Sequence, residues 1–132
     1  MMNEDEIAAG LAPTSKYCYA QRVASQLFIA GQVPHDAGSN LVGEGDPSAQ
    51  ANQCLENLFT LIELHGFEQR DIRKLIIYVA GDEQNLTDAW SAISKRFDDQ
   101  VPPATLLGVN LLGYTNQLVE IDATILKERR EL

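Results

Sequence analysis

The sequence predicts an α+β domain in which one mixed β-sheet carries two helices packed on one face. The main observation is the order of elements, which reads strand, strand, helix, strand, helix, strand, strand. Apolar residues alternate with polar ones in the last strand segment, form short runs in two others, and recur every third or fourth position in the helical segments. The length of 132 residues suits one compact domain and is too short for two.

The first 14 residues and the remainder of the chain differ in character. Residues 1–14 carry several acids together with Gly10 and Pro13, so we expect a flexible N-terminal segment. The folded domain is expected over residues 15–132. Neither a repeat nor a linker divides it.

Two strands are predicted at the start of the domain, over 17–23 and 26–32. The connection at Ala24-Ser25 lacks the Asn-Gly or glycine that a two-residue hairpin favours, so a bulge or a longer turn is expected. A turn-rich segment follows, interrupted by Leu41-Val42, which suggests a short edge strand.

Both helices have recognisable ends. Asp46-Pro47 predicts an N-cap followed by proline at the first helical position, and the helix should run to about His65, before Gly66. The second helix is predicted over 84–97, where Val101-Pro102-Pro103 prevents its continuation.

Three further strands are predicted, over 74–80, 105–112 and 117–126, the last two around a turn at 113–116. The final strand alternates strictly, so Glu120 lies on the face opposite the core. Apolar runs at 27–30 and 75–79 indicate partial burial of both sheet faces. A homo-oligomer that packs the second faces together would account for both patterns.

Composition limits the partners. The net charge is −9, with 19 acidic and 10 basic residues. Nucleic-acid affinity depends on neutralised phosphates, and an acidic surface repels anionic membranes, so neither partner is expected. The chain has no apolar run of roughly 20 residues and no secretory signal at its start, which favours a soluble, cytoplasmic protein.

Few residues have the type and spacing that catalysis, metal binding or cofactor binding requires. Cys18 and Cys54 are expected to be packing residues; His65 should complement the helix dipole and His35 should be solvated. Two histidines and two distant cysteines make no metal set, and no cofactor motif is present. Glu120 is the best candidate for a catalytic or binding role, because an acid in the middle of a half-buried strand is costly unless it is paired or used.

The role of Glu120 has two interpretations. A half-buried carboxylate either forms a salt bridge across an oligomer, with Arg22, Arg73 or Lys74 as partner, or holds and activates a water molecule. Residue chemistry alone leaves both open.

An ordered series of short motifs covers roughly residues 15–127, and together they resemble the reactive-intermediate deaminase (Rid, or YjgF) family. The motifs are Tyr17, Gly31-Gln32-Val33-Pro34, Asn40-Leu41-Val42-Gly43, Gln50, Leu55-Glu56-Asn57-Leu58, Gly66, Pro102-Pro103, Gly108-Val109 and Val119-Glu120-Ile121-Asp122. The resemblance implies a chorismate-mutase-like fold and a homotrimer with clefts between adjacent subunits. It also implies hydrolysis of reactive imines or enamines without metal or organic cofactor.

The resemblance assigns roles residue by residue. Tyr17 matches the cleft tyrosine, Glu120 the acid that holds water and Gly31 the cleft wall, while Leu106 could offer backbone groups. The family's substrate-carboxylate arginine has no counterpart, because its position falls on Ala104, or on Thr105 if the alignment shifts by one. Losing a bidentate contact of about 3 kcal/mol would weaken binding of an anionic substrate roughly a hundredfold.

Three functions are therefore considered. The first is a divergent imine or enamine deaminase that binds a small metabolite in inter-subunit clefts and uses Glu120 and water. The second is a non-catalytic trimer that binds a metabolite or a protein partner there. The third, an endoribonuclease or translation inhibitor, fits least, since the charge balance is acidic and no acid–base histidine pair is evident.

Overall fold

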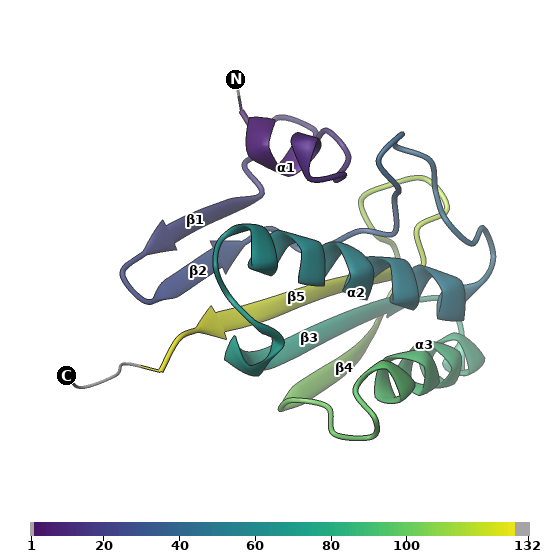
Figure 1. The fold of residues 1–132 in the computed structure, drawn as a ribbon. Helices are drawn as coiled ribbons and strands as arrows, with labels where there is room; N and C mark the ends of the chain where they lie inside the picture. The colour runs from purple at the N-terminus through teal and green to yellow at the C-terminus, as the bar shows by residue number, and fades with distance from the viewer. Residues whose placement is uncertain (1, 129–132) are drawn as a thin grey trace.

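Five strands form one mixed sheet in the order β1-β2-β5-β3-β4, and two helices cover one of its faces (Figure 1). The computed structural model describes residues 2–128. The parallel pair β3–β4 is joined through α3, and the other neighbouring strands pair antiparallel. The strands are β1 (Ala20–Val23), β2 (Gln26–Ile29), β3 (Ile72–Ala80), β4 (Ala104–Val109) and β5 (Val119–Leu126).

Helix α2 (Pro47–Leu64) begins and ends where the sequence predicts. The Asp46 carboxylate accepts a hydrogen bond from the Ala49 amide at 3.1 Å, and Pro47 occupies the first turn. Beyond the helix, Gly66 has a φ of +83°, a left-handed conformation that glycine adopts without a Cβ penalty. Helix α3 (Glu83–Arg96) is capped in the same way by Asp82, and a short 3-10 helix, η1 (Gln69–Asp71), precedes β3.

The core lies between the helices and the sheet. Leu55, Leu58 and Ile62 from α2 are fully buried against Ile77 of β3 and Ile121 of β5. Each such side chain contributes roughly 1.5–3 kcal/mol by leaving water. This burial explains why the helices share one face and confirms the predicted two-layer arrangement.

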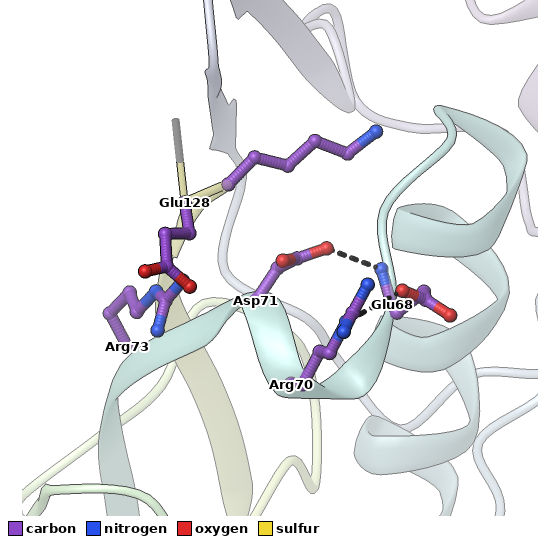
Figure 2. A pocket seen from close by; sticks show the side chains of 6 residues that line it. Glu68, Arg70, Asp71, Arg73 and Glu128 are labelled. Carbon is purple, nitrogen blue, oxygen red and sulfur yellow. Dashed lines mark hydrogen bonds and ion pairs between the residues drawn. The ribbon is translucent and has the colours of Figure 1, made fainter. Parts of the chain in front are cut away.

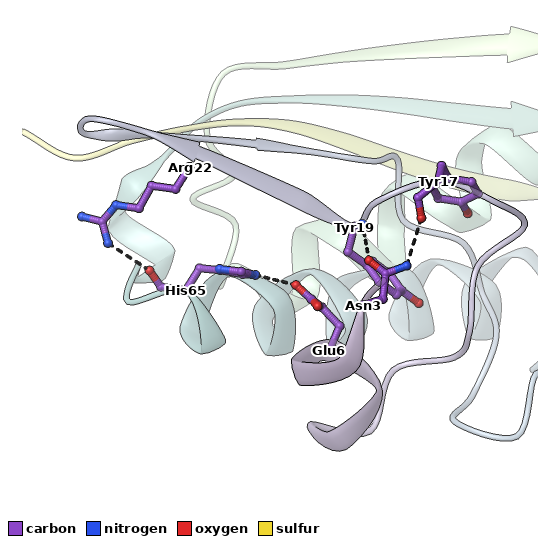
Figure 3. A network of polar contacts seen from close by, with 6 residues as sticks. All are labelled: Asn3, Glu6, Tyr17, Tyr19, Arg22 and His65. Carbon is purple, nitrogen blue, oxygen red and sulfur yellow. Dashed lines mark hydrogen bonds and ion pairs between the residues drawn. The ribbon is translucent and has the colours of Figure 1, made fainter. Parts of the chain in front are cut away.

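Part of the N-terminal segment is helical, and the flexibility expected for residues 1–14 stays a prediction. Residues Glu4–Ala8 form a short helix, α1, and Leu11 is only 2% exposed. The Asn3 side chain donates to the Tyr17 carbonyl and accepts from the Tyr19 amide, both at 2.9 Å (Figure 3). Because Asn3 occupies these backbone groups, β1 begins at residue 20 rather than at 17.

The β1–β2 connection is a two-residue loop and not the expected bulge or longer turn. Val23 pairs directly with Gln26, and Ala24 takes a φ of +53°. The irregularity lies at the other end of β2: Leu27 pairs with Ile125, whereas Gln32 bridges Ile121. The register changes by one residue between these pairs, as in a β-bulge, so β2 ends earlier than predicted.

Two other strand predictions need correction. Leu41-Val42 does not form a strand; Leu41 makes only an isolated bridge to His35. Strand β4 ends at Val109 rather than at residue 112, because its partner β3 ends at Ala80 and leaves nothing to pair with.

The sheet face opposite the helices carries exposed apolar side chains. We call it the open face. The largest exposed fractions there are 55% for Val23, 51% for Phe28, 42% for Leu107 and 39% for Leu126. Strand pairing places these residues opposite the buried positions. The predicted apolar character of this face is thus present.

Candidate functional site

Glu120 lies on β5 with its side chain on the open face, against Gly31. A Cβ added to Gly31 would lie 3.0 Å from the Glu120 carboxyl carbon and closer still to Oε2. The Gln117 side-chain amide donates to Glu120 Oε1 at 3.2 Å. The carboxylate is therefore held between a glycine and a buried amide, half-buried and within reach of solvent.

Tyr17 lies next to this carboxylate and pairs with a second tyrosine. The Tyr17 and Tyr114 hydroxyls are 3.1 Å apart. Burial raises the pKa of Tyr17 well above its ordinary value, with smaller contributions from Tyr114, Tyr19 and the negative charge of Glu120. A phenol is protonated at neutral pH even at its ordinary pKa, and the shift extends this to higher pH, so Tyr17 can donate a hydrogen bond.

Tyr114 and Gln117 were not predicted from the sequence. Gln117 is 4% exposed; its amide oxygen accepts from the Tyr114 backbone N–H at 3.1 Å, and its nitrogen also donates to the Val119 carbonyl at 3.0 Å. It thus links the Tyr114 turn to Glu120. The only sequence signal was an aromatic residue in a turn, where Gly, Asn, Asp and Ser are usual.

The β4 residues predicted for the site lie apart from Glu120 and the two tyrosines within one chain. They are Ala104, Thr105 and Leu106. Register places Thr105 on the open face, but β3 lies between β4 and β5, so two strand spacings of about 4.8 Å separate it from the Glu120 strand. Ala104 and Leu106 pack toward the core.

The backbone of Leu106 is available at the edge of the sheet. The Leu75 amide donates to the Pro103 carbonyl at 2.9 Å, which fixes the alternation of the parallel ladder. Residues 103, 105 and 107 then turn their backbone groups toward β3, and Ala104 and Leu106 turn theirs to the free edge.

Two of the three predicted salt-bridge partners of Glu120 make contacts within the chain, and a salt bridge across an oligomer stays a prediction. Arg22 donates to the His65 carbonyl and lies over the Phe67 ring, and Arg73 donates to the Leu126 carbonyl at 2.8 Å. The backbone of Lys74 lies opposite that of Thr124 in the sheet register. Within residues 2–128, the ion pairs join Glu6 to His65, Glu56 to Arg96 and Glu68 to Arg70, and they do not include Glu120.

The environments of the two histidines and two cysteines agree only in part with the predictions. His65 ends α2, as expected, and its ring also pairs with Glu6 at 2.7 Å. His35 is half-buried against the Tyr114 ring rather than solvated, and burial lowers its pKa while Asp36 opposes the shift. Cys54 is buried as predicted, with its pKa raised by desolvation; Cys18 is exposed, contrary to the packing role expected.

The part of the chain that is described, residues 2–128, holds no group of three acid, histidine or cysteine side chains placed to bind a metal ion. Over the same range, no helix has the length and apolar character needed to cross a membrane.

A cleft of about 560 Å³ lies near the far end of β5 (Figure 2). Its charges largely neutralise one another: Arg70 donates to Glu68 at 2.8 Å, and the Asp71 side chain accepts from the Glu68 amide. Lys127 lies over the Phe67 ring. This cleft contains neither Glu120 nor the tyrosines and is not part of the candidate site.

Comparison with known proteins identifies the fold family. A family model described as Endoribonuclease L-PSP matches residues 7–127. The chain belongs to this family, which is the Rid/YjgF family that the sequence motifs indicated. A RutC family protein from Pyrococcus horikoshii is 29% identical over 116 residues, covering 88% of this chain and 90% of that protein.

Two further Rid/YjgF relatives are informative. The 2-iminobutanoate/2-iminopropanoate deaminase of Salmonella typhimurium is 39% identical over 75 residues, covering 55% of this chain and 58% of that enzyme. The crystal structure of RidA from Psychrobacter has a TM-score of 0.80 at 23% identity and covers 96% of this chain and 98% of its own. These findings confirm the family and the α+β fold.

Proposed function

We propose that this Rid/YjgF protein binds a small metabolite without a carboxylate in a cleft between two copies of the chain, and hydrolyses an imine or enamine there. The observation that supports it best is the Glu120 carboxylate seated against Gly31, near the Tyr17 and Tyr114 hydroxyls and in no ion pair within residues 2–128. The similarity to a named iminobutanoate deaminase supports the reaction class.

A second copy completes the cleft in this proposal. Thr105 and the free backbone groups of Leu106 lie on β4, apart from Glu120 of the same chain, and β4 forms an open edge of the sheet. The exposed apolar side chains of the open face provide the contact surface. A homotrimer, as in the family resemblance, would set β4 of one chain opposite Glu120 of the next.

The chemistry assigned to these residues is a balanced hydrolysis. Glu120 accepts a proton from water while the water oxygen bonds to the imine carbon. Glu120 passes this proton to the nitrogen, and the new hydroxyl group loses its own proton to the nitrogen as the C–N bond breaks, so that a carbonyl compound and ammonia leave. Tyr17 donates a hydrogen bond to the reacting group.

The test compares two imines that differ in their carboxylate. The first is 2-iminopropanoate, generated in place from alanine by an amino-acid oxidase, and the second is acetophenone imine. We expect the protein to accelerate ammonia release from acetophenone imine and Glu120→Gln to abolish the acceleration. Rapid turnover of 2-iminopropanoate would contradict the proposal, because it would show that the site binds a substrate carboxylate without the arginine.

The alternative is a non-catalytic metabolite-binding trimer. The same absence of a cation beside Glu120 within residues 2–128 favours it, because anionic imino acids gain nothing there. Binding of a ligand without acceleration of either imine would select this alternative. Nuclease activity is disfavoured, since His35 contacts Tyr114 and His65 pairs with Glu6, so the two rings have separate partners.

Restoring an arginine at the position where the family has its carboxylate-binding arginine should produce a gain of function. Thr105 lies on the open face, whereas Ala104 packs against the core, so the structure favours Thr105 as the position to change. Thr105→Arg should strengthen pyruvate binding by roughly ten- to a hundredfold, measured by calorimetry. Ala104→Arg serves as the matched control: it should lower stability and leave pyruvate binding unchanged.

A further inference from the structure

We propose that Tyr17, Tyr19, His35 and Tyr114 form a cavity within a single chain that binds one uncharged aromatic or heteroaromatic ring. The cavity has a volume of about 280 Å³. The cavity shares Tyr17 with the site proposed above, but one chain forms it and imine hydrolysis is not required, so the inference names a ligand class that the proposed function does not. Three of the four tyrosines of the chain line it.

The rings around the cavity are held in place by directed contacts. The His35 and Tyr114 ring centroids are 4.9 Å apart at an interplanar angle of 63°, an edge-to-face arrangement. The Tyr19 hydroxyl donates to the Ala12 carbonyl at 2.6 Å, and Asn3 fixes the backbone on both sides of Cys18 (Figure 3). Side chains fixed before binding lose little conformational freedom when a ligand enters.

The lining carries no formal charge at neutral pH. It contains no Asp, Glu, Lys or Arg. Burial lowers the pKa of His35, raises the pKa of Tyr19 to about 12 and raises that of Tyr17 further, so all three are uncharged at pH 7. The carboxyl groups that influence these rings are Asp36 for His35, Glu120 for Tyr17 and Glu6 for Tyr19, and none of them offers a positive charge. An anionic ligand would lose its hydration and gain no cation.

The polar groups of the cavity indicate what the ring should carry. In the pair of hydroxyls at 3.1 Å, only one of Tyr17 and Tyr114 can donate to the other, which leaves one phenolic proton for a ligand. Ser15 and Ser39 add hydroxyl groups at the wall. A ring with a neutral acceptor, such as an amide carbonyl or ring nitrogen, therefore fits this chemistry.

The size of the cavity limits the ligand to one ring. Pockets for drug-sized ligands occupy roughly 300–1,000 Å³, and this cavity lies just below that range. Side chains from the N-terminal segment, the 33–39 loop and the Tyr114 turn converge on it, so elements far apart in sequence are brought together.

The test uses benzamide and benzoate, which share size and shape and differ in charge. Titration of the ¹⁵N-labelled protein at pH 7 should show benzamide shifting amides of residues 12–19, 33–39 and the Tyr114 turn. Benzoate should bind at least tenfold more weakly. Equal binding of both probes, shifts confined to other regions, or no binding of benzamide would overturn the proposal.

Three variants separate a binding cavity from structural packing. Tyr114→Leu and His35→Leu should each weaken benzamide binding at least fivefold, whereas Tyr78→Leu, at the one tyrosine outside the cavity, should leave it within twofold of wild type. A benzamide affinity that falls equally in all three would overturn the proposal. Because the comparison of benzamide with benzoate uses the unmodified protein, it tests the proposal even if a variant fails to fold. Ammonia release is measured separately, so failure of the deaminase proposal would not affect it.

Discussion

At the scale of single residues, the contact between Gly31 and Glu120 decides where the carboxylate lies. The φ angle of Gly31 is not positive, so backbone conformation does not explain why a glycine is at this position. The space its missing Cβ leaves is filled by the Glu120 carboxyl group. A pair of residues 89 positions apart in the chain therefore defines one wall of the candidate site.

Gly31→Ala should displace this carboxylate with little loss of stability. The new Cβ meets the end of a flexible glutamate side chain rather than backbone, so we expect a change of less than about 1 kcal/mol in the free energy of unfolding. Acetophenone imine hydrolysis should fall at least tenfold. Gly113→Ala is the control, because a Cβ there meets nothing within 4 Å. Full activity in Gly31→Ala would contradict the role of Glu120.

Tyr19 links stability to alkaline pH. Desolvation by burial is the main reason that its pKa rises to about 12, with smaller effects from Tyr114 and Glu6. Since the unfolded chain ionises near pH 10, this stabilisation is complete below pH 10 and is lost as the pH rises toward 12.

Tyr19→Phe should lower the free energy of unfolding by about 1 kcal/mol at pH 7, because the bond to the Ala12 carbonyl is lost. It should also reduce the further loss between pH 10 and 12, although Tyr17 still contributes there. Urea unfolding at pH 7, 10 and 11 measures both effects. An unchanged alkaline slope would show that Tyr19 does not carry this dependence.

At the scale of elements, the helices could be predicted from the sequence because their signals are local. Asp46-Pro47 and Gly66 mark the ends of α2 through caps that involve neighbouring residues. Strand ends were less predictable, since they depend on partners. β4 ends where β3 ends, and β1 begins late because Asn3 binds the preceding backbone.

The candidate site was only half predictable for the same reason. Glu120 could be found because an acid in an alternating strand is conspicuous, and Tyr17 and Gly31 entered through the family resemblance. Tyr114, Gln117 and the role of α1 depend on contacts between distant segments, for which the local sequence holds no pattern.

Helix α1 should depend on the ion pair between Glu6 and the end of α2. Glu6 is 7% exposed and pairs with His65 at 2.7 Å (Figure 3). Glu6→Ala should destabilise the segment by about 1 kcal/mol, which corresponds to roughly fivefold faster hydrogen exchange of the Ala9 and Leu11 amides. Asp5→Ala removes the same charge from an exposed position and should change exchange less. Equal effects would indicate that the His65 pair does not anchor α1.

At the scale of the whole molecule, one chain presents two incomplete features. The open face carries apolar side chains with no layer over them, and β4 leaves one edge of backbone groups unpaired within the described range 2–128. Glu120 lies on the open face, and the opposite wall of the candidate site is missing there. The unpaired β4 edge could supply that wall for a neighbouring copy. Association of copies would cover the first and supply the second, which is why the proposed cleft and the proposed trimer depend on each other.

Phe28→Glu tests this dependence directly. Phe28 is 51% exposed on the open face, so a carboxylate there should leave the isolated fold intact but oppose burial against another copy. We expect light scattering to give three times the 14.6 kDa chain mass for the wild type and the mass of one chain for Phe28→Glu. Leu64→Glu, at a leucine on α2 that is 39% exposed, should remain a trimer. Imine hydrolysis should be lost together with the trimer, because Glu120 would then face no β4 from a neighbouring copy; a fully active monomer would place the reaction within one chain.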